Sequence, residues 1–524
     1  MRNLKHKALL IILDGFGEGK DYEGNAITRA KTPNFNQLRS EFPFSLLKSH
    51  GDAVGLPSNT QGGSEVGHFT IGAGRIVYQT LEAINHAIRD KSFFEKKPLL
   101  DACAYVNSES KAALHLLGMI SDQGVHATIG HLYALLELAK SQGVTKTYIH
   151  AITDGRDVPE RSAGDFIKAI QTKIIELGMG KGSATEAVIA TICGRYYAMD
   201  RDNNWDRTQR AYELIVSGKG VHESDPFQAI KNAYERGIET DYYMEPIIIN
   251  EYAEHSTIRD KDAVIFFNFR TDRTRQLTNC FTRETEIGFT PEKTVHPFFV
   301  CMGDYSKIAP VVFGTPVVAS NLGETISKNG IHQLRIAETE KYAHVTYFFN
   351  SQIQEPYVNE DRILIDSKKA PSYAQVPEMS AREITDRLIQ EMESEKYDVI
   401  IANFANADLV GHSGNFAASV QAVEVLDECI GKIAKVAIEK KYETLITGDH
   451  GNVEYMIYDE GPEKGQQCPS HTRNPVPLFL VSEKFKSEKL QNGELKDVAT
   501  TLLSMLEIAK PIEMTGENLI TTNL

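Results

Sequence analysis

The sequence predicts an α/β fold with two domains, each a mainly parallel sheet flanked by helices. Apolar runs of strand length alternate with segments of helical periodicity along the whole chain, which is typical of parallel strands joined by helical crossovers. The 524 residues exceed what one hydrophobic core usually holds, so two or more domains are expected. Polar side chains follow many of the apolar runs directly, and ligands bind at that edge of an open parallel sheet.

Three of the expected strands end in side chains that bind metal ions. Residues 8–13 lead into Asp14, residues 399–404 lead to Asp408 and His412, and residues 444–447 lead to Asp449 and His450. The carboxyl ends of parallel strands meet at one edge of a sheet, so these side chains are expected to converge although they lie far apart in the sequence. Carboxylates and neutral imidazoles together are the ligands of a hydrolytic divalent-ion site.

Strands in the middle of the chain end in different side chains. The apolar runs 112–120, 148–153, 187–193 and 263–269 are each followed by polar turn residues and mostly by arginine. Surface charge is the usual role of arginine, but guanidinium groups after strand ends match carboxylate and phosphate oxygens bidentately. We therefore expect this part of the chain to bind a small, multiply anionic substrate. The side chains concerned are His126, Arg156, Asp157, Arg195, Arg201, Arg270 and Arg273.

The two kinds of strand end divide the chain into two expected domains, one inserted into the other. A discontinuous phosphatase-like, metal-binding domain is expected over residues 1–79 and 315–524. An inserted substrate-binding domain is expected over residues 80–314, with crossings near 77–81 and 313–316. Helices are expected over residues 128–142, 163–177, 380–394 and 416–439, the last after a capping turn at 413–415.

Composition restricts the class of partner. The formal net charge of −15 argues against nucleic acid, and it means that local arginines must capture any anionic substrate. The six cysteines form no C-x-x-C pair and are expected to be reduced thiols. Because no run approaches the ~18 apolar residues of a membrane helix, a cytoplasmic protein without a membrane partner is expected.

Each candidate metal ligand also has a plainer interpretation. Asp408 and His412 share a helix face at their spacing of four, but such pairs are often solvated. Asp449 and His450 lie among turn-forming residues. As neighbours their side chains are expected to point apart, which suits two ions ~3.5–4 Å apart better than one. His471 can be a solvent-facing loop histidine. Convergence at the strand ends favours metal binding.

Ser64, which follows two glycines, is the candidate nucleophile. A helix is expected to begin there, so the plainer role is that of an N-cap. In the functional interpretation, a phosphorylated Ser64 lies near the positive helix terminus, and a coordinated divalent cation favours its alkoxide. The glycine-rich segment 15–19 lacks G-x-G-x-x-G spacing, so a nicotinamide site is not expected.

Several motifs occur in consistent order over nearly the whole chain: IILDGFG, GSEVGH, SDQGVHAT, ITDGRDVPE, GRYYAMDRD, NFRTDRTRQL, RIAETEKYAHVTYFFN, PEMSA, NFANADLVGHSG, TGDHGN and HTRNPVP. Together they resemble the 2,3-bisphosphoglycerate-independent phosphoglycerate mutases of the alkaline phosphatase superfamily. The chain departs from that family's usual pattern at Gly63, which replaces asparagine, and at Gly448, which replaces alanine. It also lacks the usual Gly-Gly in residues 349–357, and Cys468 and Pro469 precede the last histidine.

The resemblance implies a glycolytic isomerase that interconverts 3-phosphoglycerate and 2-phosphoglycerate through a phosphoserine on Ser64. It implies two divalent ions, Mn²⁺ or alternatively Mg²⁺ or Co²⁺, in an alkaline-phosphatase-like domain, with a transferase domain inserted. One ion would be held by Asp408, His412 and His471, and the other by Asp14, Ser64, Asp449 and His450. Substrate contacts would be made by His126, Arg156, Asp157, Arg195, Arg201, Arg270, Arg273 and Lys341.

Among these residues, Ser64, Asp157 and Lys341 are the expected catalytic groups. A metal-dependent phosphatase, another phosphomutase of the same superfamily and a non-catalytic metal-binding scaffold are the alternatives. The long arginine-bearing insertion argues against a phosphatase, and Ser64 would have no use in a scaffold. The protein is expected to act as a monomer on phosphoglycerate.

Overall fold

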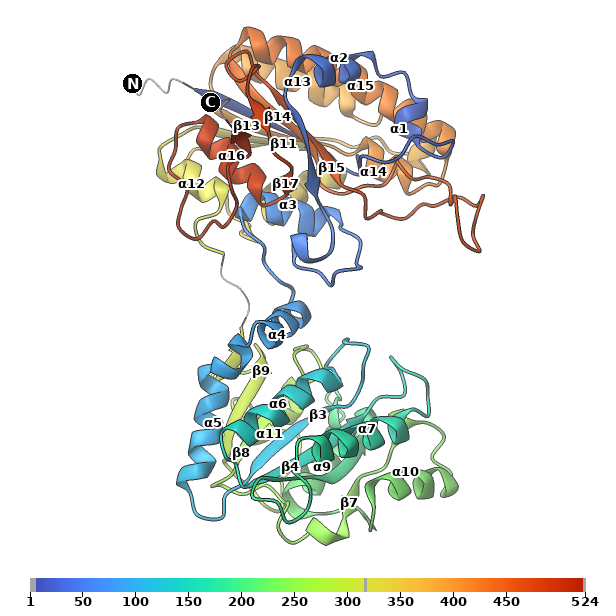
Figure 1. Ribbon diagram of the computed structural model, residues 1–524, viewed down its shortest axis with the longest axis vertical. Coiled ribbons are helices and arrows are strands. Elements are labelled where there is room, and N and C mark those ends of the chain that lie inside the picture. The colour runs from blue at the N-terminus through green and yellow to red at the C-terminus, as the bar shows by residue number, and fades with distance from the viewer. Residues whose placement is uncertain (1–5, 315–317, 522–524) are drawn as a thin grey trace. The chain divides into compact units, whose positions relative to one another are not determined.

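The computed structural model describes residues 6–314 and 318–521. The chain forms two compact units (Figure 1): the first unit comprises Met1–Tyr78 and Val317–Leu524, and the second unit comprises Gln79–Pro316. Residues 315 and 316 of the second expected crossing lie outside the described residues, as do residues 1–5, 317 and 522–524 of the expected discontinuous domain.

Within the described residues, the first unit is built on an eight-stranded sheet with a parallel centre. Strand β1 (Lys7–Leu13) lies between β13 (Val399–Phe404) and β14 (Tyr442–Gly448) and runs parallel to both. These strands are buried along most of their length, so they occur in the sequence as continuous apolar runs. The strand order is β12 (Glu360–Ile365), β11 (Gln333–Glu338), β13, β1, β14, β15 (Val476–Val481), β2 (Phe44–Lys48) and β17 (Gly493–Glu494).

Alternate side chains of β1 pack into two separate cores. Leu9 and Ile11 belong to one core, whereas Leu10 and Ile12 belong to the other. Helices cover both faces of the sheet (Figure 1). One face carries α1 (Ala26–Arg29), α2 (Pro33–Glu41), α13 (Ala381–Ser394) and α15 (Phe416–Glu439), and the other carries α3 (Ser64–Ala73), α12 (Leu322–Lys328) and α16 (Asp497–Met505).

The second unit is built on its own eight-stranded sheet, again counted over the described part of the chain. Its centre is parallel, with β8, β3, β4 and β5 adjacent in that order. The order is β10 (Val311–Phe313), β9 (Phe298–Gly303), β8 (Ala263–Phe266), β3 (Leu114–Met119), β4 (Lys146–Thr153), β5 (Glu186–Gly194), β7 (Ile247–Ile249) and β6 (Val221–Glu223). The helices are α4 (Thr80–Arg89), α5 (Lys97–Ser108), α6 (Ile129–Ser141), α7 (Ala163–Glu176), α8 (Arg195–Ala198), α9 (Trp205–Ser217), α10 (Pro226–Glu235) and α11 (Arg275–Thr282).

Most of the elements expected from the sequence are confirmed. The bounds of β13 and α15 agree with the expected ranges, and the side chain of Asn415 caps α15 by accepting a hydrogen bond from the Ala418 N–H. The expected strand over residues 263–269 is too long, because β8 ends at Phe266. Beyond that point the Phe269 N–H donates to the His126 carbonyl, so the chain has left the sheet.

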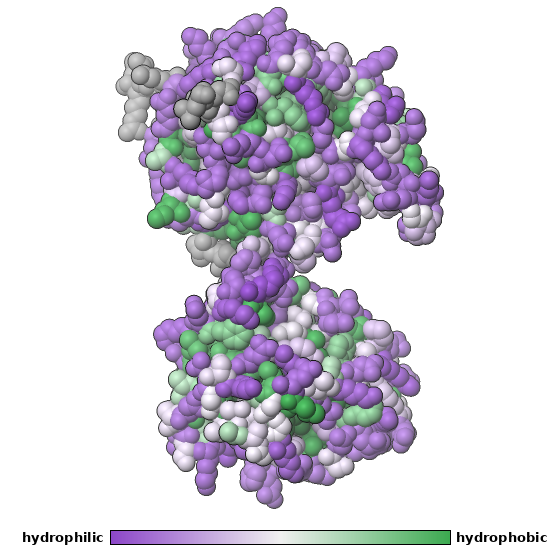
Figure 2. Space-filling view, viewed as in Figure 1, coloured by the Kyte–Doolittle hydropathy of each residue, from purple (hydrophilic) through white to green (hydrophobic). Residues whose placement is uncertain are grey.

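The expectation that the cysteines are unpaired is confirmed. The six cysteines, all in described positions, are buried and unpaired. Among the described residues, no helix combines the length and the apolar character needed to cross a membrane. In Figure 2 the visible face of each unit is mostly hydrophilic, with small scattered apolar patches.

Buried histidines make the stability of the second unit sensitive to acid. Burial lowers the pKa of His131 to about 3, and it holds the pKa of His150 well below the ordinary value of 6.5. His150 lies in a buried chain, 2.9 Å from His115 and 2.8 Å from the Thr191 hydroxyl. Each group is neutral in the folded unit, so its stabilisation is complete above about pH 6.5 and is lost as the pH falls, because the unfolded chain then binds more protons.

We expect the free energy of unfolding of the second unit to fall between about pH 6.5 and pH 5, by up to ~1.4 kcal/mol per pH unit for each such histidine. Trp205, the sole tryptophan of the chain, lies in this unit, so urea unfolding followed by its fluorescence reports on the unit selectively. A midpoint that stays constant from pH 7.5 to pH 5 would contradict the expectation.

Candidate active site

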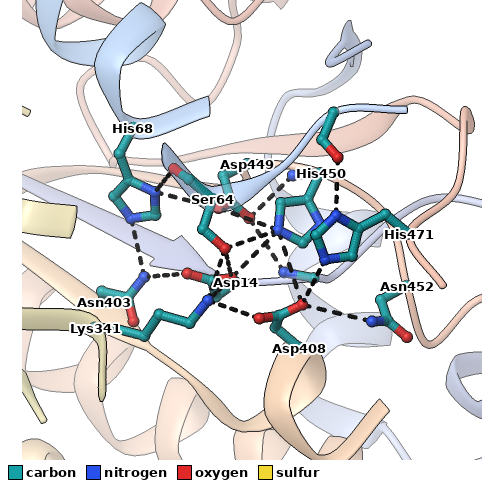
Figure 3. A network of polar contacts seen from close by, with 12 residues as sticks. Asp14, Ser64, His68, Lys341, Asn403, Asp408, Asp449, His450, Asn452 and His471 are labelled. Atoms are coloured by element: carbon teal, nitrogen blue, oxygen red, sulfur yellow. Dashed lines mark hydrogen bonds and ion pairs between the residues drawn. The ribbon is translucent and has the colours of Figure 1, made fainter. Parts of the chain in front are cut away.

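The three strand ends with metal-binding side chains converge in the first unit (Figure 3). Leu13, the last residue of β1, is level with Phe404 of β13 and with Gly448 of β14. Asp14 and Asp449 therefore follow adjacent strands at the same edge of the sheet. Asp408 lies on α14 (Asn406–Gly411), the short helix directly after β13.

Ser64 points into this cluster rather than capping its helix. It is the first residue of α3, and the N-cap position belongs to Gly63. The Ser64 hydroxyl donates to Asp14 Oδ1 at 2.9 Å, lies 3.0 Å from His450 Nε2 and accepts a hydrogen bond from Lys341 Nζ at 2.6 Å. The N-cap interpretation of Ser64 is therefore wrong, and its oxygen is held among charged groups near a helix N-terminus.

Lys341 is a buried ammonium group at the centre of the cluster. Besides Ser64 it donates to Asp14 at 2.8 Å and to Asp408 at 2.6 Å. Burial opposes its charged form, but the carboxylates of Asp14 and Asp408 raise the pKa of Lys341 above its ordinary value. Lys341 therefore stays protonated at neutral pH, and it cannot serve as the base for Ser64.

Asp408, His412 and His471 form a set of three converging ligand atoms. The Nε2 atoms of both histidines lie 3.2 Å from Asp408 Oδ1 and 2.9 Å from each other. Their Nδ1 atoms face backbone carbonyls, of Pro469 at 2.8 Å and of Gly62 at 2.9 Å. A neutral imidazole that donates through Nδ1 presents a lone pair at Nε2. Two lone pairs and a carboxylate oxygen then face one another, an arrangement that fits a cation.

Asp14, Asp449 and His450 lie on the Ser64 side of the cluster. His450 Nε2 is 3.4 Å from Asp14 Oδ1 and 3.6 Å from Asp449 Oδ2. The expectation that the neighbouring side chains of Asp449 and His450 point apart is therefore wrong. Asp449 Oδ1 accepts from the N–H groups of His450 and Gly15, which turns the carboxylate back over the following residue.

The raised pKa of His450 reflects the excess of negative charge in the cluster. Burial opposes the imidazolium, but the carboxylates of Asp449, Asp14 and Asp408 raise the pKa of His450 to about 10. A divalent cation satisfies the same carboxylates and releases that proton. The donor set thus fits divalent-ion binding, and the described residues contain three groups of ligand atoms close enough for it.

His68 and Asn403 were not among the predicted site residues, yet both lie in the cluster with no exposed surface. His68 lies four residues after Ser64 on α3, and that spacing places the two on one helix face. This spacing within GSEVGH was the available signal for His68. Asn403 lies inside an otherwise apolar strand, where the amide alone is a weak signal.

Steric packing explains why residue 448 is glycine, but it does not explain why residue 63 is glycine. A Cβ at residue 448 would lie 2.3 Å from the Phe16 carbonyl oxygen, so alanine would require the loop after β1 to move. At residue 63 the nearest atoms to a Cβ are those of the His471 ring at 3.6 Å, an ordinary van der Waals distance.

Two of the predicted residues of the second unit, Asp157 and His126, contact a third, Arg195, which is buried just after β5. Arg195 Nη1 donates to Asp154 at 2.5 Å and to Asp157 at 2.6 Å, and Nη2 lies 3.0 Å from His126 Nε2. Burial, together with Arg195 and Arg270, lowers the pKa of His126 to about 4, so its imidazole is neutral at pH 7. Asp154 is a further participant that was not predicted.

The other arginines of the second unit lie closer to solvent. Arg201 and Arg270 are exposed and both pair with Asp272, whereas Arg273 is half-buried and donates to the Met199 carbonyl. Burial and the charges of Arg201, Arg195 and Arg156 lower the pKa of Arg273. Guanidinium groups close enough to repel one another are suited to an anion with several negative charges.

Known proteins resemble the chain over nearly its full length. Residues 84–307 match the family described as BPG-independent PGAM N-terminus (iPGM_N). The chain is 48% identical over 516 residues to a 2,3-bisphosphoglycerate-independent phosphoglycerate mutase of Moorella thermoacetica, with 98% of both chains covered. It is 44% identical over 521 residues to the protein of that name from Clostridioides difficile, with 99% of both covered. A Leishmania mexicana phosphoglycerate mutase, solved at low cobalt concentration, matches with 28% identity and a TM-score of 0.53 over 99% of this chain and 98% of that chain.

Proposed function

The chain belongs to the 2,3-bisphosphoglycerate-independent phosphoglycerate mutases, and we propose that it interconverts 3-phosphoglycerate and 2-phosphoglycerate through a phosphoserine on Ser64. The observation that carries the proposal is the Ser64 hydroxyl, 2.6 Å from the Lys341 ammonium and 2.9 Å from Asp14 in a buried cluster of potential metal ligands. Such an isomerase needs a hydroxyl that can take up and return a phosphoryl group.

The charge and donor set support two divalent ions in the first unit. We assign Asp408, His412 and His471 to one ion, and Asp14, Ser64, Asp449 and His450 to the other. When bound, the ions supply positive charge that stabilises the Ser64 alkoxide and the phosphoryl oxygens. We propose Mn²⁺, with Mg²⁺ or Co²⁺ as alternatives, and the cobalt named for the Leishmania mexicana mutase supports a site open to such ions.

The chain's own groups perform the first transfer. The Ser64 oxygen, having lost its proton to solvent as the alkoxide forms, attacks phosphorus in line, so that the Oγ–P bond forms as the bond from phosphorus to the glycerate oxygen breaks. Lys341 is protonated and already hydrogen-bonded to the Ser64 oxygen. It therefore stabilises negative charge on the Ser64 oxygen and on the phosphoryl group. The second transfer is the reverse reaction, with the other hydroxyl of glycerate as the acceptor.

Between the two transfers, glycerate must stay bound and present its other hydroxyl. We assign its carboxylate to residues of the second unit: Arg156, Arg201, Arg270 and Arg273, together with Arg195, whose Nη2 lies 3.0 Å from His126 Nε2. Asp157 is the proposed acid and base. It gives a proton to the departing glycerate oxygen and takes one from the attacking hydroxyl, and its contact with Arg195 fixes its position.

We propose further that the protein acts as a monomer in the cytoplasm with phosphoglycerate as its only partner. The net charge of −15 argues against nucleic acid as a further partner.

An enolase-coupled assay tests the proposed function. The full chain, with Mn²⁺ and 3-phosphoglycerate and without bisphosphoglycerate, is expected to form 2-phosphoglycerate, and chelation of the metal is expected to stop it. Release of inorganic phosphate without 2-phosphoglycerate would show a phosphatase instead.

Arg195→Lys is expected to lower kcat/KM for 3-phosphoglycerate by about 10²-fold, because one ammonium cannot reach Asp154, Asp157 and His126 together and the site loses its alignment. The coupled assay measures the change. Arg210→Lys is the matched control, since Arg210 is exposed and stacks on Tyr197 in the same unit. If the two variants had equal kcat/KM, Arg195 would have no role in the site.

A further inference from the structure

We propose that His68 and Asn403 are positioning residues that orient Asp14 and Asp449 on either side of the nucleophile. This inference rests on the proposed function, because it concerns the same metal-binding carboxylates. Both residues are fully buried, and neither belongs to the ligand sets assigned above. Figure 3 shows them side by side, on the side of the cluster away from His471.

Asn403 fixes the orientation of Asp14. Its side-chain amide lies 2.9 Å from Asp14 Oδ2 and 2.9 Å from His68 Nε2, so each of its two hydrogens has an acceptor. Since Oδ2 is held in this way, Oδ1 is the oxygen that faces Ser64 and Lys341. The register explains the placement: Asn403 is level with Ile12, whose side chain lies on the α3 face of the sheet.

The contact with Asn403 also determines the proton position on His68. Because Nε2 accepts from the amide, the neutral ring carries its hydrogen on Nδ1. Nδ1 lies 2.9 Å from the Ser64 carbonyl oxygen, to which it donates its hydrogen. It also lies 3.2 Å from Asp449 Oδ2, an electrostatic contact to an oxygen that has no hydrogen bond of its own among the described residues. His68 thus hydrogen-bonds the backbone of the nucleophile and places its N–H beside the second oxygen of Asp449, whose first oxygen is held by backbone N–H groups.

The same contacts argue against a role for His68 as a metal ligand. Its ligand atoms lie within 4.8 Å of those of Asp14 and Asp449, close enough for a shared ion. Both ring nitrogens are already engaged, however, one as acceptor and one as donor, and a metal needs a free lone pair. The His344 ring covers the imidazole of His68 edge to face, with the centroids 5.4 Å apart, and stabilises this orientation.

Residues of this kind do not bind the metal themselves, but they hold the metal ligands in the orientation that the ion requires. Their replacement typically weakens metal binding or activity by 10–100-fold. Loss of the His68–Asn403 pair removes one restraint from Asp14 and one from Asp449, although their other contacts remain, so the ions would bind more weakly. The site would still assemble at high metal concentration.

Two substitutions separate the contacts of His68. In His68→Asn the amide nitrogen takes the place of Nδ1 and keeps the donor to the Ser64 carbonyl, beside Asp449. In His68→Gln the amide oxygen takes the place of Nε2 and keeps the acceptor for Asn403. His68→Ala removes both contacts. His131→Gln is the matched control, because His131 is a buried histidine of the second unit that hydrogen-bonds Asn85.

The test is Mn²⁺ binding to the full-length, metal-free protein by isothermal titration calorimetry, with the metal-free Tm of each variant recorded alongside. We expect His68→Ala to raise the Kd for Mn²⁺ by 10–100-fold with the number of ions unchanged, and the Asn and Gln variants to lie between it and wild type. kcat at saturating Mn²⁺ is expected to recover largely, with KM for phosphoglycerate unchanged. If His68→Ala does not fold, His68→Gln carries the test, since it keeps one of the two contacts.

Three results would overturn part of the account, and they are distinguishable. If all His68 variants bound Mn²⁺ with the wild-type Kd, even with a lower Tm, His68 would have only a structural role and the proposed positioning role would be wrong. Loss of one ion from the stoichiometry would make His68 a ligand. If the wild-type protein itself bound no Mn²⁺, Mg²⁺ or Co²⁺, the proposed function would fail rather than the positioning role.

Discussion

Replacing Ser64 by alanine is expected to abolish mutase activity, with kcat reduced by 10⁴-fold or more in the enolase-coupled assay, on the order of the loss when other enzymes lose their nucleophile. No other hydroxyl contacts both Lys341 and Asp14 among the residues that the structure describes. The fold should survive, because the Ser64 side chain makes no capping bond and alanine favours the first turn of a helix.

Ser419→Ala provides the control for this prediction. Ser419 is a buried serine of α15 in the same unit, and its hydroxyl has no hydrogen-bond partner, so its loss should leave kcat unchanged. Residual activity in Ser64→Ala above about one per cent of wild type would place the phosphoryl acceptor elsewhere.

The second large effect is expected for Lys341→Met. Methionine has nearly the length of lysine but no charge, so Asp14 and Asp408 would face Ser64 without their shared cationic partner. Since the ammonium group also stabilises charge on the transferred group, kcat should fall by about 10²–10³-fold, the usual effect of removing one such donor. The coupled assay at saturating Mn²⁺ measures it.

The same substitution should also destabilise the metal-free protein. Removing one partner of a buried ion pair typically costs ~3–5 kcal/mol, because the remaining charge is left without compensation. Lys328→Met is the control, since Lys328 pairs with Glu324 on the exposed side of α12. A Lys341→Met enzyme with wild-type kcat would show that this ammonium group takes no part in the transfer.

The central strands and the convergence of their ends could be predicted from the sequence. Strands such as β1 and β13 are buried on both faces of the sheet, so nearly all of their residues are apolar. Such a continuous apolar run can be recognised in the sequence. Asp14 and Asp449 follow such runs directly. For strands that are parallel and adjacent, this alone is enough to bring the side chains together.

The contacts around those side chains could not be predicted, because they depend on register and on packing between elements. Asn403 reaches Asp14 only because it lies level with Ile12, which points to the face that carries α3. His68 reaches Asp449 only because α3 packs closely there, with no room for a side chain at Gly67 beside the Asp449 carbonyl. The orientation of Ser64 away from the cap position also depends on Asp14, Lys341 and His450, far away in the sequence.

The most direct measurement of the central claim is the location of the phosphoryl group in the working enzyme. Wild-type protein with Mn²⁺ would be mixed with 3-phosphoglycerate, quenched in acid within one turnover, digested and mapped by mass spectrometry. We expect one phosphoryl group on Ser64, lost when the metal is chelated before mixing. Unmodified Ser64 during turnover, with the phosphoryl group on another serine or with no acid-stable phosphoryl group on the protein, would contradict a phosphoserine intermediate.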